Sequence, residues 1–541
     1  MFAKSHSARV KLPLLICSFF AVAVAAPSAL AQSASMPLPG PHAAPSLDPH
    51  DLSGVWWTRS NDSTFRPIKG EIPFTVAGRK TYAATAAGLK SGAIDDPALS
   101  RCLAPGPSRV MAAPYPLQIV QTKDEVTIIP EAWHAYRQVF MGAKHTADDE
   151  IDPSFMGESV GHWEGDTLVI DTAGLKDNVW LDATGIPHSD ALHIIERIRK
   201  LPGGAQFEDV ITFSDAKTFT QAWSARRVYE WRPDIQLTDY FCTDRNRDIA
   251  WANRLPKLPP AVAKRAEPPA VPAGAVDFSG VYNHKKRGAG VGRGEYRYAL
   301  AVTSDKSPPP LLPWAKANLD RHKQAIADGH PITTQVTHCL GFGMPDFLTQ
   351  PYPYKFIQTG RLLVILGEAD HQYRIIKLNQ PHPKLSETTW SGNSVGHWDG
   401  DTLVIETIGQ SDRSMFSGAG IPKTEALILT ERLRLTENGS VIEDRMTVDD
   451  AGTYSKPWEA LWQLDRMPAG SRLQEYMCAE NERDVALFAT GNNRPAAGGP
   501  PAGPGGPPAP SGGPPLGEGP RPVRPTGAPP PPPANADPKQ R

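Results

Sequence analysis

The chain is poor in cysteine, in net charge and in long hydrophobic segments, and each shortage excludes a class of protein. Its 541 residues include five cysteines and carry a formal net charge of −2. A protein that binds nucleic acid needs a basic face, which a mildly acidic chain does not supply. The apolar run from Leu12 to Ala26 is broken by Pro13 and is too short to span a bilayer. We therefore expect neither a nucleic-acid partner nor a transmembrane segment.

Residues 1–31 have the pattern of a cleaved secretory signal peptide. Lys4, Arg9 and Lys11 form a basic start, the apolar run follows, and Ala29-Leu30-Ala31 is a small-x-small cleavage site. Removing this segment removes three positive charges, so the formal net charge changes from −2 to −5. It also leaves four cysteines, an even number, as is typical of an oxidising compartment. The sequence predicts a periplasmic or secreted bacterial protein.

The rest of the chain contains one sequence twice. Ser159–Thr172 returns as Ser394–Thr407 with two differences in fourteen positions, and both differences keep a carboxylate. The flanks repeat at a nearly constant offset, in the pairs Tyr115 and Tyr352, His134 and His371, Glu196-Arg197 and Glu431-Arg432, Trp223 and Trp458. The period is far longer than that of a solenoid or a propeller blade, so it indicates a tandem duplication of a whole domain.

The four cysteines fit one disulfide in each copy. The length of chain between Cys102 and Cys242 is nearly the same as that between Cys339 and Cys478. In the chain-entropy model a closed loop as long as these stabilises the fold by about 4 to 5 kcal/mol. We predict the bridges Cys102–Cys242 and Cys339–Cys478.

Three segments lack the apolar residues that a packed core needs, and they divide the chain. We expect a signal peptide (1–31), a disordered leader (32–50), a first domain (51–254), a Pro-rich linker (255–276), a second domain (277–492) and a disordered Pro/Gly-rich tail (493–541). Each domain is large enough for a core of its own. The two domains are called copy 1 and copy 2 below.

The hydrophobic pattern of each copy is mostly that of β-strands. Copy 1 has expected strands at Gly54–Trp56, Leu117–Gln121, Val126–Phe140, Val160–Trp163, Thr167–Asp171, Ala191–Lys200, Phe207–Phe213, Ala225–Trp231 and Leu237–Cys242. Helical segments are expected near Val76–Leu89 and Leu312–Ala327, and Trp163–Thr167 is typical of a tight hairpin turn. Consecutive strands with short connections favour a mainly β fold: two tandem antiparallel up-and-down β-barrels, closed so that no edge stays open.

Two resemblances accompany this pattern. The opening Gly54-Val55-Trp56 is similar to the first-strand Gly-x-Trp signature of the lipocalin group, whose barrels hold one small ligand. Gly161–Val169, with Pro187-His188-Ser189 beyond it, resembles a group of secreted bacterial proteins carrying Gly-x-Trp-Glu-Gly-Asp-Thr-Leu-Val. That group has no established activity, so the resemblance implies a class and no chemistry. Copy 2 departs from the pattern at Lys423 and Ile428, where copy 1 has His188 and His193.

A nucleophile-elbow pattern, Gly-x-Ser-x-Gly, occurs at Gly157–Gly161 and again at Gly392–Gly396. In serine hydrolases the serine of this motif is exposed on a strand-to-helix turn, above an oxyanion hole. Here the motif leads directly into a strand and a hairpin, and no helix follows. We interpret Ser159 as a strand or loop residue rather than a nucleophile.

A second candidate site is the segment Glu131–Arg137, repeated as Glu368–Arg374. If Val126–Phe140 is one strand, His134 and Tyr136 share a face and Arg137 lies on the other. His134 and Tyr136 in a barrel lumen would bind a polar ligand or act as acid and base. The alternative is a structural pair, with Arg137 forming an external salt bridge for which Glu196 is a candidate partner.

Three further histidines are candidates. If the hairpin loop has three residues, His162 shares a face with Val160, Leu168 and Ile170, where a satisfied core histidine is the alternative to a ligand-binding one. His188 and His193 occur only in copy 1, and with His134 they would form an acid/base set or a three-histidine metal site. Their spacing matches no standard ligand pattern, so we expect no metal and no cofactor. Any single active pocket would lie in copy 1.

The leading hypothesis is a secreted or periplasmic binding protein that holds a small, partly apolar molecule in the first barrel. Candidate binding residues are His134, Tyr136, His162, Tyr115 and Trp163, and candidate catalytic residues are His134, Tyr136, His188 and His193. One alternative is a cofactor-independent hydratase, lyase or isomerase, by analogy with other tandem lipocalin-like barrels. Another is an envelope interaction protein whose Pro-rich tail engages a partner.

Overall fold

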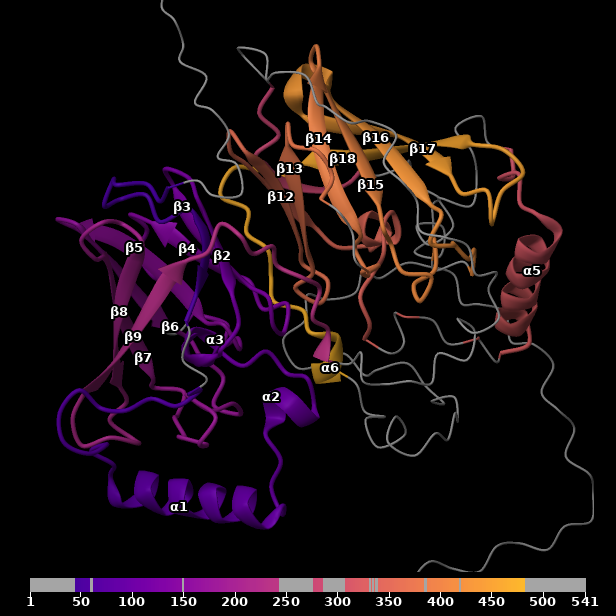
Figure 1. Ribbon diagram of the computed structural model, residues 1–541. Coiled ribbons are helices and arrows are strands. Elements are labelled where there is room, and N and C mark those ends of the chain that lie inside the picture. The colour runs from indigo at the N-terminus through magenta and orange to yellow at the C-terminus, as the bar shows by residue number, and fades with distance from the viewer. Residues whose placement is uncertain are drawn as a thin grey trace, which may run out of the picture. The chain divides into compact units, whose positions relative to one another are not determined.

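The computed structural model describes residues 44–58, 62–147, 150–242, 276–285, 307–329, 332, 335, 339–383, 387–417 and 420–481. These residues form two closed β-barrels of nine strands each, which confirms the predicted mainly β fold with tandem barrels (Figure 1). The predicted signal peptide, nearly all of the linker and the tail lie outside the described residues.

The first barrel is formed by copy 1, and its strands lie in the ring in chain order. Its strands are β1 (Gly54–Trp57), β2 (Leu117–Gln121), β3 (Glu125–Pro130), β4 (Arg137–Met141), β5 (Glu158–Glu164), β6 (Thr167–Ala173), β7 (His193–Lys200), β8 (Gln206–Ser214) and β9 (Trp223–Trp231). Trp56 pairs with Trp231, so β1 and β9 close the ring. The predicted strand Leu237–Cys242 does not form. That segment makes one isolated bridge, from Tyr240 to Ala132.

The second barrel repeats this arrangement. Its strands are β10 (Gly280–His284), β11 (Tyr354–Gln358), β12 (Leu362–Gly367), β13 (Tyr373–Leu378), β14 (Asn393–Asp399), β15 (Thr402–Ile408), β16 (Ile428–Thr436), β17 (Val441–Asp449) and β18 (Trp458–Arg466). Short helical turns accompany it at η5 (Asp346–Thr349), η6 (Glu437–Gly439) and α6 (Cys478–Asn481).

One strand pair in each barrel differs from a simple meander. All described neighbours in the two rings are antiparallel except β4 with β5 and β13 with β14, which are parallel. A hairpin cannot join parallel neighbours, so the chain must return to the other end of the barrel between them. Residues 142–157 and 379–392 make these two crossover connections, and the first contributes to the cleft described below.

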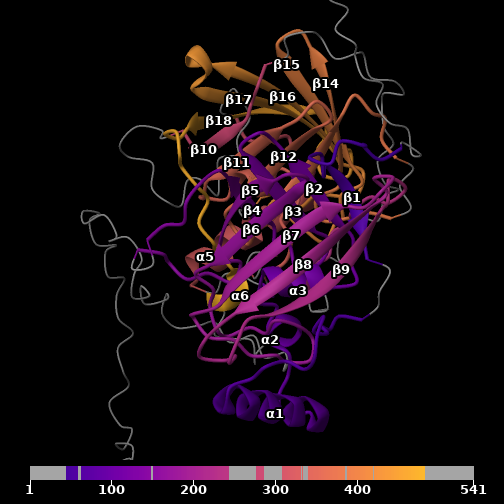
Figure 2. The same cartoon turned by 90° about the vertical axis from the view of Figure 1, so that its left-hand side faces the viewer.

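Both predicted helices form, as α1 (Val76–Ser91) and α5 (Pro313–Ala327). The Thr75 side chain caps α1 by accepting a hydrogen bond from Gly78 N at 3.0 Å, and Gly92 ends the helix at φ 74°, a conformation that glycine adopts without strain. Thr75 N donates to Thr218 O, which ties the helix to the β8–β9 connection. In both views α1 therefore lies beyond one end of the barrel (Figures 1 and 2). Two short helices follow, α2 (Pro97–Ser100) and α3 (Pro107–Ala112).

The predicted hairpin between β5 and β6 forms, but its register differs from the one assumed for His162. Glu164 pairs with Thr167, so the loop has two residues, Gly165 and Asp166, and not three. His162 pairs with Val169 and its side chain is 60% exposed. The prediction that His162 faces the core with Leu168 and Ile170 is therefore wrong. A loop shorter by one residue moves the side chain to the outer face.

The interiors of the barrels are packed with apolar side chains. In the first barrel the ring of Phe207 lies 4.8 Å from Trp56 and 4.6 Å from Tyr229, between ring centroids, and all three side chains are buried. In the second barrel Tyr282 packs edge-on against Phe356 at 5.3 Å. Barrels of this size have an interior just wide enough for side chains to fill. The described interior residues therefore act as a packed core.

A charged cluster is buried in each barrel. Arg137 donates to Ser159 Oγ at 2.9 Å and to Thr172 Oγ1 at 2.6 Å, and it forms an ion pair with Glu196. Burial and the neighbouring Glu196 carboxylate raise the pKa of Asp209 well above its usual value. The predicted partner Glu196 is confirmed. The predicted external position is wrong, because the Arg137 side chain is only 2% exposed.

Copy 2 contains the same cluster at the matching positions. Arg374 donates to Ser394 Oγ at 3.0 Å, to Thr407 Oγ1 at 2.8 Å and to Glu431 Oε1 at 2.9 Å. Burial and Glu431 raise the pKa of Asp444 well above its usual value, as for its counterpart. The serine of each elbow-like motif thus lies on a strand, which agrees with the predicted strand or loop position, and it is buried and accepts from arginine.

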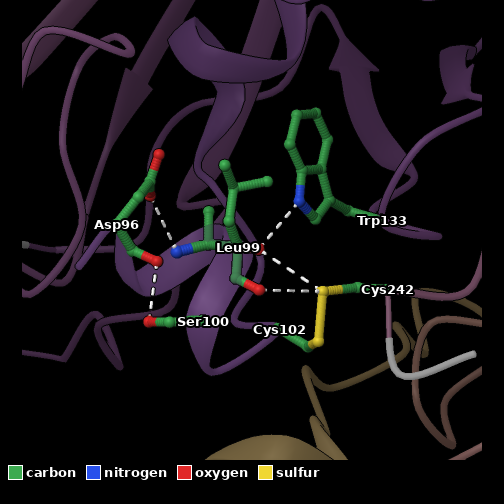
Figure 3. Close-up of a disulfide and its surroundings, with 7 residues drawn as sticks. Asp96, Leu99, Ser100, Cys102, Trp133 and Cys242 are labelled. Carbon is green, nitrogen blue, oxygen red and sulfur yellow. Dashed lines mark hydrogen bonds between the residues drawn. A yellow bond between two sulfur atoms is a disulfide. The ribbon is translucent and has the colours of Figure 1, made fainter. Parts of the chain in front are cut away.

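Both predicted disulfides form, Cys102–Cys242 and Cys339–Cys478. Figure 3 shows the first of them beside α2 and Trp133. Trp133 Nε1 donates to Ala98 O at 2.9 Å, and the Cys242 sulfur lies 3.5 Å from Leu99 O (Figure 3). The disulfide, the short helix and the indole therefore form one cluster next to the turn that carries His134. Among the described residues, none of the helices has the length and apolar content needed to cross a membrane.

Candidate binding cleft between the two copies

The segment that carries His134 is a tight turn and not a strand. β3 ends at Pro130 and β4 begins at Arg137, so the single strand predicted over Val126–Phe140 is wrong. Trp133 and His134 have φ of 66° and 50°, and their counterparts Asp370 and His371 have 53° and 49°. Two successive left-handed residues reverse the chain sharply, as in a type I′ turn. The turn projects His134 out of its own barrel.

The turn of each copy contacts the other copy, and the two sets of contacts are reciprocal. Tyr136 Oη donates to Gly367 O at 3.1 Å, and Tyr373 Oη donates to Pro130 O at 3.3 Å. The ring of His134 stacks on Tyr373 with centroids 4.9 Å apart, and the ring of Tyr136 lies 4.9 Å from His371. An apolar cluster shared by both copies surrounds these contacts: Val120, Ile129, Tyr136, Ile357, Val364, Leu366 and Tyr373. The duplicated domains thus pair like the subunits of a twofold dimer.

Two crossed segments strengthen this pairing. We call residues 237–241 and 473–477, which precede Cys242 and Cys478, the arms. Asp239 in the first arm accepts from Ser391 N of copy 2 at 2.8 Å. Glu475 in the second arm accepts from Phe155 N at 2.6 Å and from Met156 N at 3.0 Å, both in copy 1. Each arm therefore uses a carboxylate to hold the backbone of the other copy.

A cleft of about 430 Å³ opens where the second arm lies against copy 1. Residues of both copies line it: Tyr136, Arg137, Gln138, Phe140, Thr146, Glu150, Ile151, Asp152, Pro153, Ser154, Met156, Gly157, Glu158, Lys176, His371, Arg472, Leu473, Gln474 and Glu475. The crossover 142–157 supplies a large part of this lining. A volume of this size suits a small organic ligand.

The polar groups of the cleft are fixed before any ligand arrives. Burial raises the pKa of Glu158, but hydrogen bonds from Thr146 and Arg472 outweigh it and lower the pKa, so Glu158 is ionised. Burial lowers the pKa of His371, so its imidazole is neutral. Its Nε2 lies 3.9 Å from Glu475 Oε2, and its buried Nδ1 has no hydrogen-bond partner. A neutral imidazole beside a carboxylate can accept from or donate to a ligand hydroxyl or amide.

His134 is the counterpart of His371 in copy 1, but neighbouring side chains close the space around its ring. Phe241 stacks on the His134 ring with centroids 3.9 Å apart, and Tyr373 covers it on another side. In copy 2 the residue next to the disulfide is Met477, which cannot stack in this way, so His371 reaches the cleft. Burial and the nearby His371 lower the pKa of His134 to about 3, and neither of its ring nitrogens has a hydrogen-bond partner. His134 acts here as a buried aromatic ring.

The other predicted site residues lie apart from the cleft. Tyr115 packs against Trp133 and Tyr240, and Trp163 packs against His50 and the first core. His188 is buried with Nδ1 3.0 Å from Ser189 O, and burial lowers its pKa.

His193 is half exposed beside Asp171, with Nδ1 3.5 Å from Asp171 Oδ1. None of these contacts joins His188 or His193 to His134, so the grouping of the three histidines is wrong. Within the described ranges, no group of three or more His, Cys, Asp or Glu side chains could hold a metal ion.

Sequence reasoning missed several polar residues that line the cleft or contact its lining. Glu475 and Arg472 lie in or beside the second arm, and His145 lies in the crossover of copy 1 with Nδ1 3.2 Å from Glu158. The repeat itself contained the signal for two of them. Asp239 matches Glu475, and His145 matches His382, at the same offset as the rest of the repeat. Polar residues that both copies keep outside the main motif were therefore the signal that could have indicated these positions.

The chain matches no protein-family model. It also has no match among curated proteins. The resemblance to a group of secreted bacterial proteins therefore stays a prediction, and the function has to be argued from the site.

Proposed function

We propose that this protein is a secreted or periplasmic binding protein that holds a small, partly apolar molecule in the cleft between its two copies. The observation that carries the proposal is the composition of the cleft, which side chains of both copies line. The sequence alone favoured the interior of the first barrel. Because apolar side chains pack that interior, the cleft is the better candidate site.

The lining of the cleft fits a ligand with one apolar and one polar side. Phe140, Ile151, Met156 and Leu473 offer apolar surface. His371 and the ionised Glu158 offer hydrogen-bonding groups held in place by the surrounding protein. The wall of the cleft is more polar than apolar, and a few fixed polar groups in a preformed pocket orient a small molecule. The two disulfides support the proposed oxidising compartment.

Native mass spectrometry of the full chain, purified from its own host, tests the proposal. We expect a bound small molecule that is retained by the wild type and lost from a Leu473→Trp variant, whose larger side chain fills the cleft. The free ligand is then titrated into His371→Ala and His134→Ala, a matched pair in the two copies. Loss of a polar partner in a dry pocket costs about 1 to 3 kcal/mol, or roughly a tenfold to hundredfold loss of affinity.

We expect that loss for His371→Ala and only a small change for His134→Ala. This order is the reverse of the one that the sequence alone suggests, because Phe241 seals His134 from the cleft. Equal retention of the molecule by the wild type and by Leu473→Trp would show that the cleft is not the site.

A further inference from the structure

The charged side chains that line the cleft between the copies do not balance. Each of the three cations in the lining has a carboxylate partner of its own: Arg137 with Glu196, Lys176 with Glu480, and Arg472 with Glu158. Three further carboxylates line the cleft: Glu150, Asp152 and Glu475. None of these three pairs with a cation among the described residues, because the imidazole beside Glu475 is neutral. They leave a formal charge of −3 without a counter-charge.

The surroundings of Tyr136, which also lines the cleft, show the same excess of negative charge. Burial raises the pKa of the Tyr136 hydroxyl well above its usual value, and the carboxylates of Glu368 and Glu475 raise it further. Neighbouring negative charges disfavour a phenolate, and they favour a cation at the same place.

The unbalanced carboxylates occupy an outer and an inner position. Glu150 and Asp152 are exposed, so they lie at the mouth of the cleft, where it meets solvent. Glu475 is inside, with a side chain that is 11% exposed, next to the 5% exposed side chain of His371. The ligand therefore passes two carboxylates at the mouth before it reaches the third.

The inner pair of groups lacks a hydrogen-bond donor between them. Glu475 Oε2 and His371 Nε2 are 3.9 Å apart, which is too long for a direct hydrogen bond. A single ligand nitrogen that donates to both atoms would bridge this distance. The neutral ring accepts at Nε2 in the tautomer that carries its proton on Nδ1, and a carboxylate can only accept.

We infer that the cleft binds a primary amine with an apolar body, whose ammonium group donates to Glu475 and His371. The inference rests on the proposed function, because it names the class of ligand for the same cleft. An ammonium group has three donors and no acceptor, so it suits two inner acceptors. Its hydrogen bond to a carboxylate is roughly twice as strong as a neutral one. Ile151, Met156 and Leu473 offer apolar surface for the rest of the molecule.

Three probes that share a phenylalkyl body separate the possible chemistries. Isothermal titration calorimetry of the full chain would use 2-phenylethylamine, 2-phenylethanol and 3-phenylpropanoate. We expect the protonated amine to bind, the alcohol to bind at least tenfold more weakly, and the carboxylate not to bind at millimolar concentration. Raising the salt from about 0.02 M to about 0.5 M should weaken the amine and leave the alcohol unchanged. If the alcohol or the carboxylate binds as tightly as the amine, or if the amine does not bind at millimolar concentration, the inference fails.

A matched pair of variants in the arms tests the inner contact. Glu475→Gln removes the inner charge and should weaken binding of 2-phenylethylamine at least tenfold. Asp239→Asn, the same change in the first arm, should leave it unchanged. Circular dichroism checks the fold of both variants, because Glu475 also accepts from two backbone N–H groups of copy 1. Equal affinity of the wild type and a folded Glu475→Gln variant would overturn the inner contact.

A double variant at the mouth tests the charge without touching those backbone contacts. The side chains of Glu150 and Asp152 form no hydrogen bond or ion pair with the described residues, so Glu150→Gln with Asp152→Asn should keep the fold. We expect the amine to bind about twofold to fivefold more weakly at low salt, since exposed charges interact weakly through water. Glu387→Gln, the counterpart of Asp152 in copy 2, should bind the amine like the wild type. Unchanged affinity in the double variant would show that the charge of the cleft does not select the ligand.

The Leu473→Trp variant separates this inference from the proposed function. If it loses the molecule found by native mass spectrometry and that molecule is neutral or anionic, the cleft is a binding site but the inference of an amine is wrong. If Leu473→Trp keeps both that molecule and the affinity of the wild type for 2-phenylethylamine, neither ligand occupies the cleft, and both proposals fail.

Discussion

Copy 1 and copy 2 share the charged cluster inside each barrel but differ at the arms and on the outer faces of the barrels. The cluster of Arg137, Glu196 and Asp209 returns as Arg374, Glu431 and Asp444, with matching hydrogen bonds to a serine and a threonine and a matching ion pair. At the arms, by contrast, Phe241 becomes Met477. At the outer faces His193 becomes Ile428. The first change opens the way to His371, and the second removes a nitrogen beside a carboxylate. The fold therefore accounts for the shared cluster, and two of the differences lie beside the arms and the outer faces.

A third difference lies in a buried position without a described cavity. His188 of copy 1 corresponds to Lys423, whose Nζ donates to Ser411 O at 2.6 Å. Burial lowers the pKa of Lys423 to about 7. Each buried base approaches a backbone carbonyl, but the two carbonyls are at non-equivalent positions, Ser189 in copy 1 and Ser411 in copy 2. This difference illustrates divergence that does not by itself indicate a site.

The largest expected effect concerns what the copies share. Arg137→Met and Arg374→Met should each destabilise the protein by about 3 to 5 kcal/mol, because each leaves a buried glutamate without its partner. Urea denaturation followed by tryptophan fluorescence measures the loss. If only one of the two variants is destabilised, the clusters are not equivalent in energy despite their matching ion pairs. A loss below about 1 kcal/mol in both would mean that water compensates for the missing guanidinium.

The next effect should appear in the pH dependence of stability. Burial and His371 hold the pKa of His134 at about 3, whereas an unfolded histidine has a pKa of about 6.5. Between these values the unfolded chain binds a proton at His134 that the folded chain does not bind. The free energy of unfolding therefore falls as the pH falls from 6.5 towards 3. The contribution is on the order of a few kcal/mol.

His134→Phe removes this titration and keeps an aromatic ring between Phe241 and Tyr373. We therefore expect its urea midpoint to fall less than that of the wild type between pH 6.5 and pH 4. His162→Gln, at an exposed position, serves as the control and should follow the wild type. Parallel curves for His134→Phe and the wild type would contradict a neutral buried His134.

A smaller effect tests the pairing of the copies. Tyr136→Phe removes the hydrogen bond to Gly367 O, and Tyr373→Phe removes its reciprocal to Pro130 O. Each should cost about 0.5 to 1.5 kcal/mol, as is usual for a neutral buried hydrogen bond. We expect the larger loss for Tyr136, whose bond is shorter. Chemical denaturation of the two variants and of the double variant checks this, and stability equal to the wild type would mean that the contacts do not hold the copies together.

The sequence predicted the barrels well because alternation, hairpin residues and the repeat all depend on local chemistry. The strands from Thr167 to Trp231 lie within a few residues of their predicted ranges, and both disulfides follow from counting cysteines. The cleft could not be predicted in this way. It depends on the left-handed turn at Trp133 and His134, where no glycine marks the reversal, and on arms that cross to the other copy. Neither feature has a periodic pattern. A one-residue error in the hairpin loop was enough to misplace His162.

The smallest expected effect concerns the elbow-like motif. Ser159→Ala should change ligand binding in the cleft by no more than a few fold, and Ser394→Ala should behave in the same way. Ser159 is buried on β5, where it accepts from Arg137 and shares a hydrogen bond of 2.9 Å with Thr172, so its oxygen is occupied and shielded from solvent. Titration of the ligand into each variant measures the change in binding. Treatment of the wild type with a serine-reactive fluorophosphonate, followed by mass spectrometry, tests whether Ser159 is a nucleophile, and we expect no adduct. A covalent adduct at Ser159 would show that the barrel opens there and that the serine is a nucleophile after all.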